Sequence, residues 1–101
     1  MINTYKLSLD NLIVQSKGNI VSNMDGEKVM MSIKNGKYYN LGEIGGRIWD
    51  LIEEQVSVNN LIVNLLSEYT IEQLECEEQV VSFLELLNKE GLIYIQKGEN
   101  S

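Results

Sequence analysis

The sequence contains no histidine and no proline, and it has a single cysteine, Cys76. Without histidine, the chain cannot form a Ser–His or Cys–His nucleophilic pair or a histidine metal site. A single cysteine cannot form an internal disulfide, and it cannot supply the ligands of a cysteine-based zinc site. We therefore expect a protein that binds a partner and is not an enzyme, with no cofactor and no metal.

Basic residues are also scarce, with 8 lysines and arginines against 15 aspartates and glutamates, for a formal net charge of −7. Binding to nucleic acid draws much of its affinity from neutralised phosphates, so this balance argues against a DNA or RNA partner. No apolar run approaches the roughly 20 residues that cross a bilayer. Residues 1–6 lack the basic start and apolar segment of an export signal. We expect a cytoplasmic protein with no membrane contact.

The first part of the chain is predicted to form strands. Residues 12–15 are short, apolar and β-branched, and residues 20–21 read as a short extension after a turn. Residues 28–34 and 37–41 flank Asn35-Gly36, a strong hairpin signal because both positions tolerate positive φ. Apolar residues recur at every second position of the first hairpin strand, which predicts a half-buried face made of Val29, Met31 and Ile33.

The register of this hairpin has two alternatives. A two-residue turn would place Ile33 opposite Tyr38. A three-residue loop with Gly36 in a bulge would place Tyr39 opposite Met31, and we favour it because it gathers the larger apolar set on one face. In either case one of the two tyrosines lies on the opposite face, so the second strand is expected to carry aromatic surface on both sides.

The remainder of the chain is predicted to be helical. Residues 43–54 have helical apolar spacing, and Gly45-Gly46 in the first turn suggests a close backbone approach. Ser57 is a good N-cap for a second amphipathic helix that runs to Tyr69. The third helix is expected over residues 72–90. Its predicted boundaries are a capping box of Thr70 with Gln73 and a C-terminal Gly91, before a short strand over residues 92–95.

This order predicts an α+β, winged-helix-turn-helix-like fold, in which an N-terminal antiparallel β-sheet of about three strands is followed by three α-helices. The length of 101 residues predicts one domain, over residues 1–96, with a polar, frayed tail at residues 97–101. The helix-turn-helix shape invites a DNA-binding interpretation, but the third helix presents at least five glutamates and one late lysine, which disfavours it.

Few residues of the third helix are candidates for chemistry. Cys76 shares a helical stripe with Val80 and Phe83, so it is most simply a core residue, and no histidine is present to activate it. Glu75 and Glu78 could act as an acid/base pair, but a solvated helix face explains them better. No glycine pattern matches a phosphate-binding loop.

The apolar arc of the third helix is wider than one small sheet requires. Either the first two helices cover the excess, or one shoulder of the helix faces a groove that is open to a partner. In the second case strand 37–41 would form the other wall, and an incoming peptide could add to its edge by β-augmentation. Glutamates at the rim would favour a peptide that carries lysine or arginine.

Three segments of the chain, residues 37–49, 58–61 and 83–93, resemble PqqD-like proteins, the precursor-peptide recognition elements of ribosomal natural-product pathways. The resemblance is greatest to the leader-binding half of a split lasso-peptide maturation protease. It implies a winged-helix-like domain to which the leader adds as a strand and lies against the third helix. The implied peptide-binding residues are Tyr38, Tyr39, Asn40 and Leu41 on the strand, and Glu75, Cys76, Gln79, Val80 and Phe83 on the helix.

The same resemblance implies a non-catalytic adaptor that delivers the precursor to a separate cysteine protease or another maturation enzyme. One alternative is a peptide chaperone that presents a precursor to a radical enzyme in cofactor (PQQ-type) biosynthesis, with the same fold and groove. Another is an acidic, transcription-factor-like domain that binds protein rather than DNA. The partner enzyme would distinguish the first two.

Overall fold

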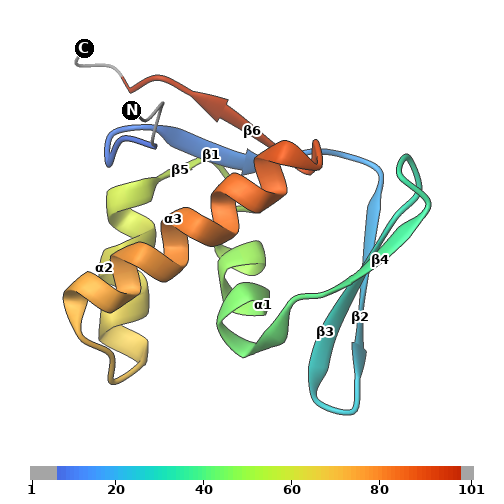
Figure 1. Cartoon of the computed structure of the whole chain (residues 1–101), viewed down its shortest axis with the longest axis horizontal. Coiled ribbons are helices and arrows are strands. Elements are labelled where there is room, and N and C mark those ends of the chain that lie inside the picture. The colour runs from blue at the N-terminus through green and yellow to red at the C-terminus, as the bar shows by residue number, and fades with distance from the viewer. Residues whose placement is uncertain (1–6, 99–101) are drawn as a thin grey trace, which may run out of the picture.

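The computed structural model describes residues 7–98, and it is an α+β fold with two antiparallel three-stranded sheets and three helices (Figure 1). The first sheet has the order β5-β1-β6, and the second has the order β2-β3-β4. The strands are β1 (Leu12–Gln15), β2 (Asn19–Met24), β3 (Glu27–Ser32), β4 (Lys37–Asn40), β5 (Val56–Ser57) and β6 (Ile93–Gln96). The helices are α1 (Gly42–Leu51), α2 (Val58–Glu68) and α3 (Gln73–Lys89).

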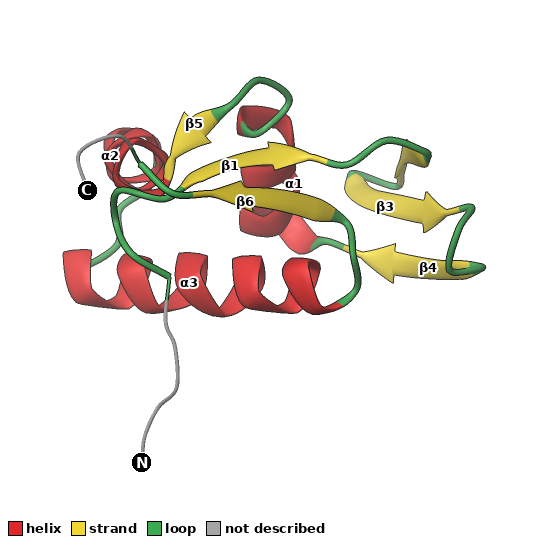
Figure 2. Cartoon of the chain, turned by 90° about the horizontal axis from the view of Figure 1, so that it is seen from above, coloured by secondary structure: helices red, strands yellow, loops and turns green. Residues whose placement is uncertain are grey.

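The α+β class with three helices is confirmed, but the arrangement of one N-terminal sheet before the helices is not. The first sheet takes its strands from the beginning, middle and end of the chain, with β5 and β6 antiparallel to β1 on either side. Figure 2 shows β1 and β6 side by side above α3. Residues 99–101 of the predicted tail lie outside the described residues. Within residues 7–98, no helix combines the length and the apolarity that a bilayer crossing requires.

The hairpin register predicted for β3 and β4 is wrong by one residue. Met31 lies opposite Tyr38, not Tyr39, because the loop contains four residues, 33–36. The amide of Gly36 donates to the carbonyl oxygen of Ser32 over 2.8 Å, and Gly36 has a φ of 66°. A shift of one residue exchanges the two faces of a strand. The buried side chains of β3 are those of Met30 and Ser32, so the predicted face was the wrong one: Val29 and Met31 lie half-buried on the opposite face, and Ile33 is exposed.

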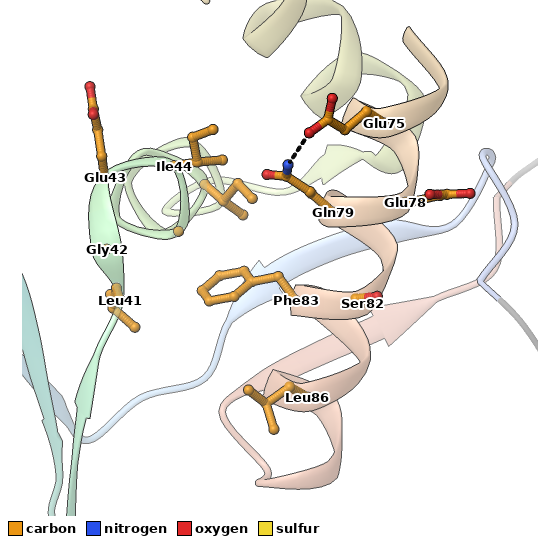
Figure 3. A pocket seen from close by; sticks show the side chains of 12 residues that line it. Leu41, Gly42, Glu43, Ile44, Glu75, Glu78, Gln79, Ser82, Phe83 and Leu86 are labelled. Atoms are coloured by element: carbon orange, nitrogen blue, oxygen red, sulfur yellow. Dashed lines mark hydrogen bonds between the residues drawn. The ribbon is translucent and has the colours of Figure 1, made fainter. Parts of the chain in front are cut away.

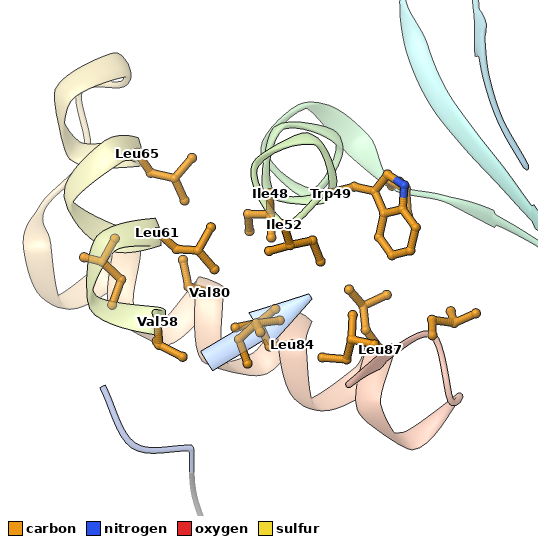
Figure 4. Close-up of a cluster of buried hydrophobic side chains, with 14 of the residues drawn as sticks. Ile48, Trp49, Ile52, Val58, Leu61, Leu65, Val80, Leu84 and Leu87 are labelled. Atoms are coloured by element: carbon orange, nitrogen blue, oxygen red, sulfur yellow. The ribbon is translucent and has the colours of Figure 1, made fainter. Parts of the chain in front are cut away.

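The core lies between the three helices and the first sheet, as Figure 4 shows. Helix α1 contributes Ile48 and Ile52, and α2 contributes Leu61 and Leu65, all of them essentially fully buried. Helix α3 packs on both through one apolar stripe made of Cys76, Val80, Leu84 and Leu87. Burial of these aliphatic side chains, each contributing roughly 1.5–3 kcal/mol, fixes α1 and α3 relative to one another.

Two predicted helix boundaries are confirmed. The hydroxyl of Ser57 accepts a hydrogen bond from the Asn60 amide over 3.0 Å, so Ser57 is the N-cap of α2. At the end of α3, Gly91 has a φ of 75°. The amide of Leu92 donates to the Leu87 carbonyl over 2.9 Å, which closes a Schellman motif and turns the chain into β6.

Two other boundaries differ from the prediction. The N-cap of α3 is Glu72, without a side-chain cap, so the capping box of Thr70 with Gln73 does not form. Because α3 begins at Gln73, Thr70 lies two residues before the N-cap position and Gln73 is not the third residue of the helix. Helix α1 ends at Leu51 rather than at residue 54. Carbonyl groups at its C-terminal end accept hydrogen bonds from β1. The Gln15 amide bonds the Ile52 carbonyl over 3.0 Å.

Candidate functional site

The outer edge of β4 carries no strand in the part of the chain that the structure describes. The amide of Leu41 donates to the Lys28 carbonyl over 2.9 Å, and this bond fixes the phase of the ladder. Hydrogen-bonded and non-hydrogen-bonded pairs alternate in antiparallel sheets, so the main chain of Tyr39 faces β3. The N–H and C=O groups of Tyr38 and Asn40 therefore point away from the sheet, toward the open edge.

A groove of about 740 Å³ lies between the β4–α1 junction and one face of α3. Figure 3 shows the Phe83 ring projecting from α3 toward α1, with Leu41 and Ile44 on the facing wall. Leu86 extends the apolar lining toward the C-terminal end of α3 and is half exposed. The full lining is Leu41, Gly42, Glu43, Ile44, Gly45, Ile48, Glu75, Glu78, Gln79, Ser82, Phe83 and Leu86.

The close backbone approach expected at Gly45-Gly46 is confirmed. A Cβ on Gly45 would lie 2.9 Å from Cε1 of Phe83, and one on Gly46 would lie 3.1 Å from Cβ of Lys28. At contacts this short, a side chain at either position would require its neighbour to shift. Gly45 thus lets the Phe83 ring lie directly on the backbone of α1 and form the base of the groove, while Gly46 lets β3 approach the same helix.

The rim of the groove is acidic. Three glutamates, Glu43, Glu75 and Glu78, are exposed and belong to the lining, and the lining contains no lysine or arginine. Glu75 is held in place by Gln79, whose amide nitrogen donates to Oε2 over 3.2 Å. An apolar base surrounded by carboxylates favours an apolar side chain that is flanked by a cation.

A polar cluster ties the hairpin to the C-terminal end of α3. The Tyr39 hydroxyl donates to Oε1 of Glu90 over 2.8 Å. Asn35 donates to the Tyr39 hydroxyl over 3.1 Å and to the Glu90 carbonyl over 2.9 Å. Lys37 lies 3.5 Å from the same carboxylate. The hydrogen bond from Tyr39, followed by the charge of Lys37, lowers the pKa of Glu90. This cluster anchors β4 next to α3.

We expect Tyr39→Phe to reduce the dependence of stability on pH in the acid range. The pKa of Glu90 is lower in the folded state than in the unfolded state. Its carboxylate therefore contributes to the free energy of unfolding above the unfolded-state pKa, and this contribution is lost as the pH falls through the folded-state pKa. The loss therefore falls at pH values below the ordinary pKa of a glutamate carboxyl group. Thermal unfolding at several pH values should show a smaller fall in Tm for Tyr39→Phe than for the natural chain. Parallel curves for the two proteins would show that the hydrogen bond has no such role.

The structure places most of the predicted site residues at the groove or at the adjoining strand edge. Leu41, Glu75, Gln79 and Phe83 line the groove. The two tyrosines of the strand edge point in opposite directions. Tyr38 is 73% exposed, whereas Tyr39 points inward and bonds Glu90. Asn40 lies at the open edge, where its side-chain oxygen accepts the Gly42 amide over 3.1 Å and helps to turn the chain into α1.

Cys76 and Val80 do not line the groove, in contrast to what the resemblance implied. Their exposed fractions are 2% and 0%, and both belong to the core between α2 and α3. Their shared helical stripe indicated this core position. Burial raises the pKa of the Cys76 thiol, which keeps it protonated and unreactive.

Sequence reasoning missed the α1 side of the groove, where Glu43, Ile44 and Ile48 contribute to the lining. The Gly45-Gly46 pair was the available signal, because it marked the helix that another element approaches. Ser82 and Leu86 of α3 were also missed, although Leu86 lies on a shoulder of the apolar arc. Among residues 7–98, no group of three or more acidic or cysteine side chains is placed to hold a metal ion.

The chain matches the family model described as Coenzyme PQQ synthesis protein D (PqqD), over residues 27–93. The match runs from β3 to the start of β6 and spans both walls of the groove. The chain belongs to the PqqD family. A search of the curated proteins gives no significant match.

Two solved structures resemble this PqqD-family chain. "TbiB1 in Complex with the TbiA(beta) Leader Peptide" is 26% identical with a TM-score of 0.70, and the similarity covers 79% of this chain and 93% of that one. "Lasso peptide synthetase B1 complexed with the leader peptide" is 20% identical, also with a TM-score of 0.70, and 81% of this chain and 96% of that one are covered. The second likeness concerns the fold alone. Both of those proteins are bound to a leader peptide.

Proposed function

We propose that this chain is a non-catalytic adaptor that binds the leader segment of a ribosomally made precursor peptide by strand addition to β4. The observation that carries the proposal is the open edge of β4 beside an apolar groove with an acidic rim. An added strand would bond the outward main-chain groups of Tyr38 and Asn40. Alternate leader side chains would then face the groove around Phe83.

The partner that receives the bound precursor is a separate maturation enzyme, for which we propose a lasso-peptide leader peptidase. The 26% identity to TbiB1, a protein seen in complex with a leader peptide, supports leader binding, and the choice of a peptidase as the partner is our proposal. A second candidate, presentation of a precursor to a radical enzyme in PQQ-type cofactor synthesis, is supported by membership of the PqqD family. Reconstitution with each class of enzyme distinguishes them, because only the true partner should depend on this chain to process its precursor.

We also propose an architecture and a location for the adaptor. The domain predicted over residues 1–96, of which the structure describes residues 7–96, is one leader-binding unit in which α2, α3 and the β2–β4 hairpin sheet are winged-helix-like. The site of action is the cytosol, where a ribosomally made precursor first meets its recognition protein.

Calorimetric titration with leader peptides from the same gene cluster tests the proposal. We expect saturable binding of one leader per chain in the presence of EDTA and without nucleotide, because the groove needs neither for strand addition. A leader with its lysines and arginines replaced by glutamine should bind more weakly at low salt, since rim glutamates would lose their counter-charges. Absence of binding for every leader of the cluster would contradict the adaptor function.

Gly45→Ala tests the base of the groove without adding charge. The new Cβ would displace the Phe83 ring into the space that a leader side chain would occupy. Alanine is favoured over glycine in a helix by up to about 1 kcal/mol, so stability should be kept or raised. Leader affinity should fall by roughly threefold to tenfold, or about 0.7–1.4 kcal/mol. Equal affinity in the two proteins would mean that the leader does not reach this part of the groove.

A further inference from the structure

The β2-β3-β4 sheet has a second apolar face, which lies away from the core and outside the groove. Three of its side chains are exposed, namely Ile20 at 51%, Met24 at 58% and Tyr38 at 73%, and Ile33 in the adjoining β3–β4 loop is 61% exposed. We define this outer face by those four residues together with the half-buried Val29 and Met31.

The observed register aligns three of these side chains in one row across the sheet. Met31 lies directly opposite Ile20 of β2 on one side and opposite Tyr38 of β4 on the other. Met30, the next residue of β3, is fully buried on the inner face. The solvent face of an antiparallel sheet is normally polar, and a contiguous apolar surface marks an interaction site more often than chance exposure does.

The outer face is continuous with the proposed leader site but separate from the groove. None of its residues lines the groove. A leader strand added to β4 would become a fourth strand of this sheet, and its outward side chains would lie next to Tyr38. A protein seated on the outer face would therefore touch the adaptor and the bound leader together.

We propose that the outer face docks the maturation enzyme that acts on the bound precursor, an inference that rests on the proposed leader-binding function. The enzyme would present an apolar surface with a basic rim, since this chain carries a net charge of −7, Glu27 of β3 lies opposite Met24, and Asp25 follows Met24 in the turn. The same net charge disfavours a second copy of the chain as the occupant, because two acidic molecules repel one another.

The test compares Ile20→Lys with Val63→Lys, which introduces the same charge at a side chain that is 55% exposed on α2. Both variants are assayed with a labelled leader for affinity, and with the full-length precursor and the processing enzyme of the same gene cluster for turnover. We expect leader affinity to stay within about twofold for both variants. For Ile20→Lys alone, the adaptor concentration that gives half-maximal processing should rise at least tenfold, as for loss of a hot-spot contact.

The outcomes separate this inference from the proposed function. If the natural chain binds no leader, the adaptor function itself fails. If both variants bind the leader and support processing equally, the outer face does not dock the enzyme. If sedimentation shows a dimer of the natural chain that Ile20→Lys dissociates, with processing unchanged, the face joins two copies of the chain and the inference is overturned.

Discussion

Replacing Phe83 by aspartate is expected to weaken leader binding at least tenfold, which corresponds to about 1.4 kcal/mol. The Phe83 ring forms the base of the groove and lies against the backbone of α1 at Gly45. A buried aromatic anchor is a typical binding hot spot. The substitution also adds a carboxylate to a lining that already contains Glu75, Glu78 and Glu43, which further disfavours an apolar guest. Fluorescence anisotropy with a labelled leader measures the effect.

Two controls accompany this variant. Tyr94→Asp places the same charge at a residue of β6 that is 60% exposed and does not line the groove, so it should leave affinity unchanged. Phe83→Leu keeps an apolar side chain and should lose less affinity than Phe83→Asp. If Phe83→Asp is folded by circular dichroism and binds as the natural chain does, the assignment of the groove is wrong.

Tyr38→Pro is expected to block strand addition while the protein stays folded. The amide of Tyr38 points away from β3, so proline removes a donor that the fold does not use. Proline is tolerated on an edge strand when its N–H side faces solvent. A guest strand would lose this donor and leave one carbonyl unpaired, at about 1–3 kcal/mol, so affinity should fall by roughly fivefold to a hundredfold.

The matched control is Tyr38→Ala, which removes the exposed ring and keeps the amide. Its effect on affinity should be clearly smaller than that of Tyr38→Pro if the main chain is what the leader uses. Titration of both variants with the same labelled leader shows whether the leader contacts the main chain or the side chain of Tyr38. Similar losses for alanine and proline would show that the tyrosine side chain, rather than the strand edge, makes the contact.

The hairpin shows what local sequence signals can and cannot determine. Asn35-Gly36 correctly marked the turn, in which Gly36 but not Asn35 has a positive φ. The signal does not specify loop length. Four residues form the loop, and its tightest bond runs from the Gly36 amide to Ser32. The loop length is tied to the packing of Met30 against the core, which is a tertiary contact. The same packing decides which apolar side chains of the hairpin lie on the outer face.

The candidate site was predicted only in part, because it also depends on tertiary contacts. Helical periodicity correctly placed Cys76 and Val80 on one apolar stripe, which proved to be the core stripe. Periodicity alone cannot say which shoulder of α3 remains open, because that depends on where α1 packs. Phe83 belongs to the open side since Gly45 admits its ring, and this contact joins residues far apart in the sequence.

Amide hydrogen exchange of β4, measured residue by residue with and without a leader peptide, tests strand addition most directly. Tyr39 donates within the sheet, so its amide should be protected in both states. The amides of Tyr38 and Asn40 should exchange rapidly in the free chain and become protected when the leader is added. A saturating leader that leaves both of these amides in rapid exchange would contradict the account.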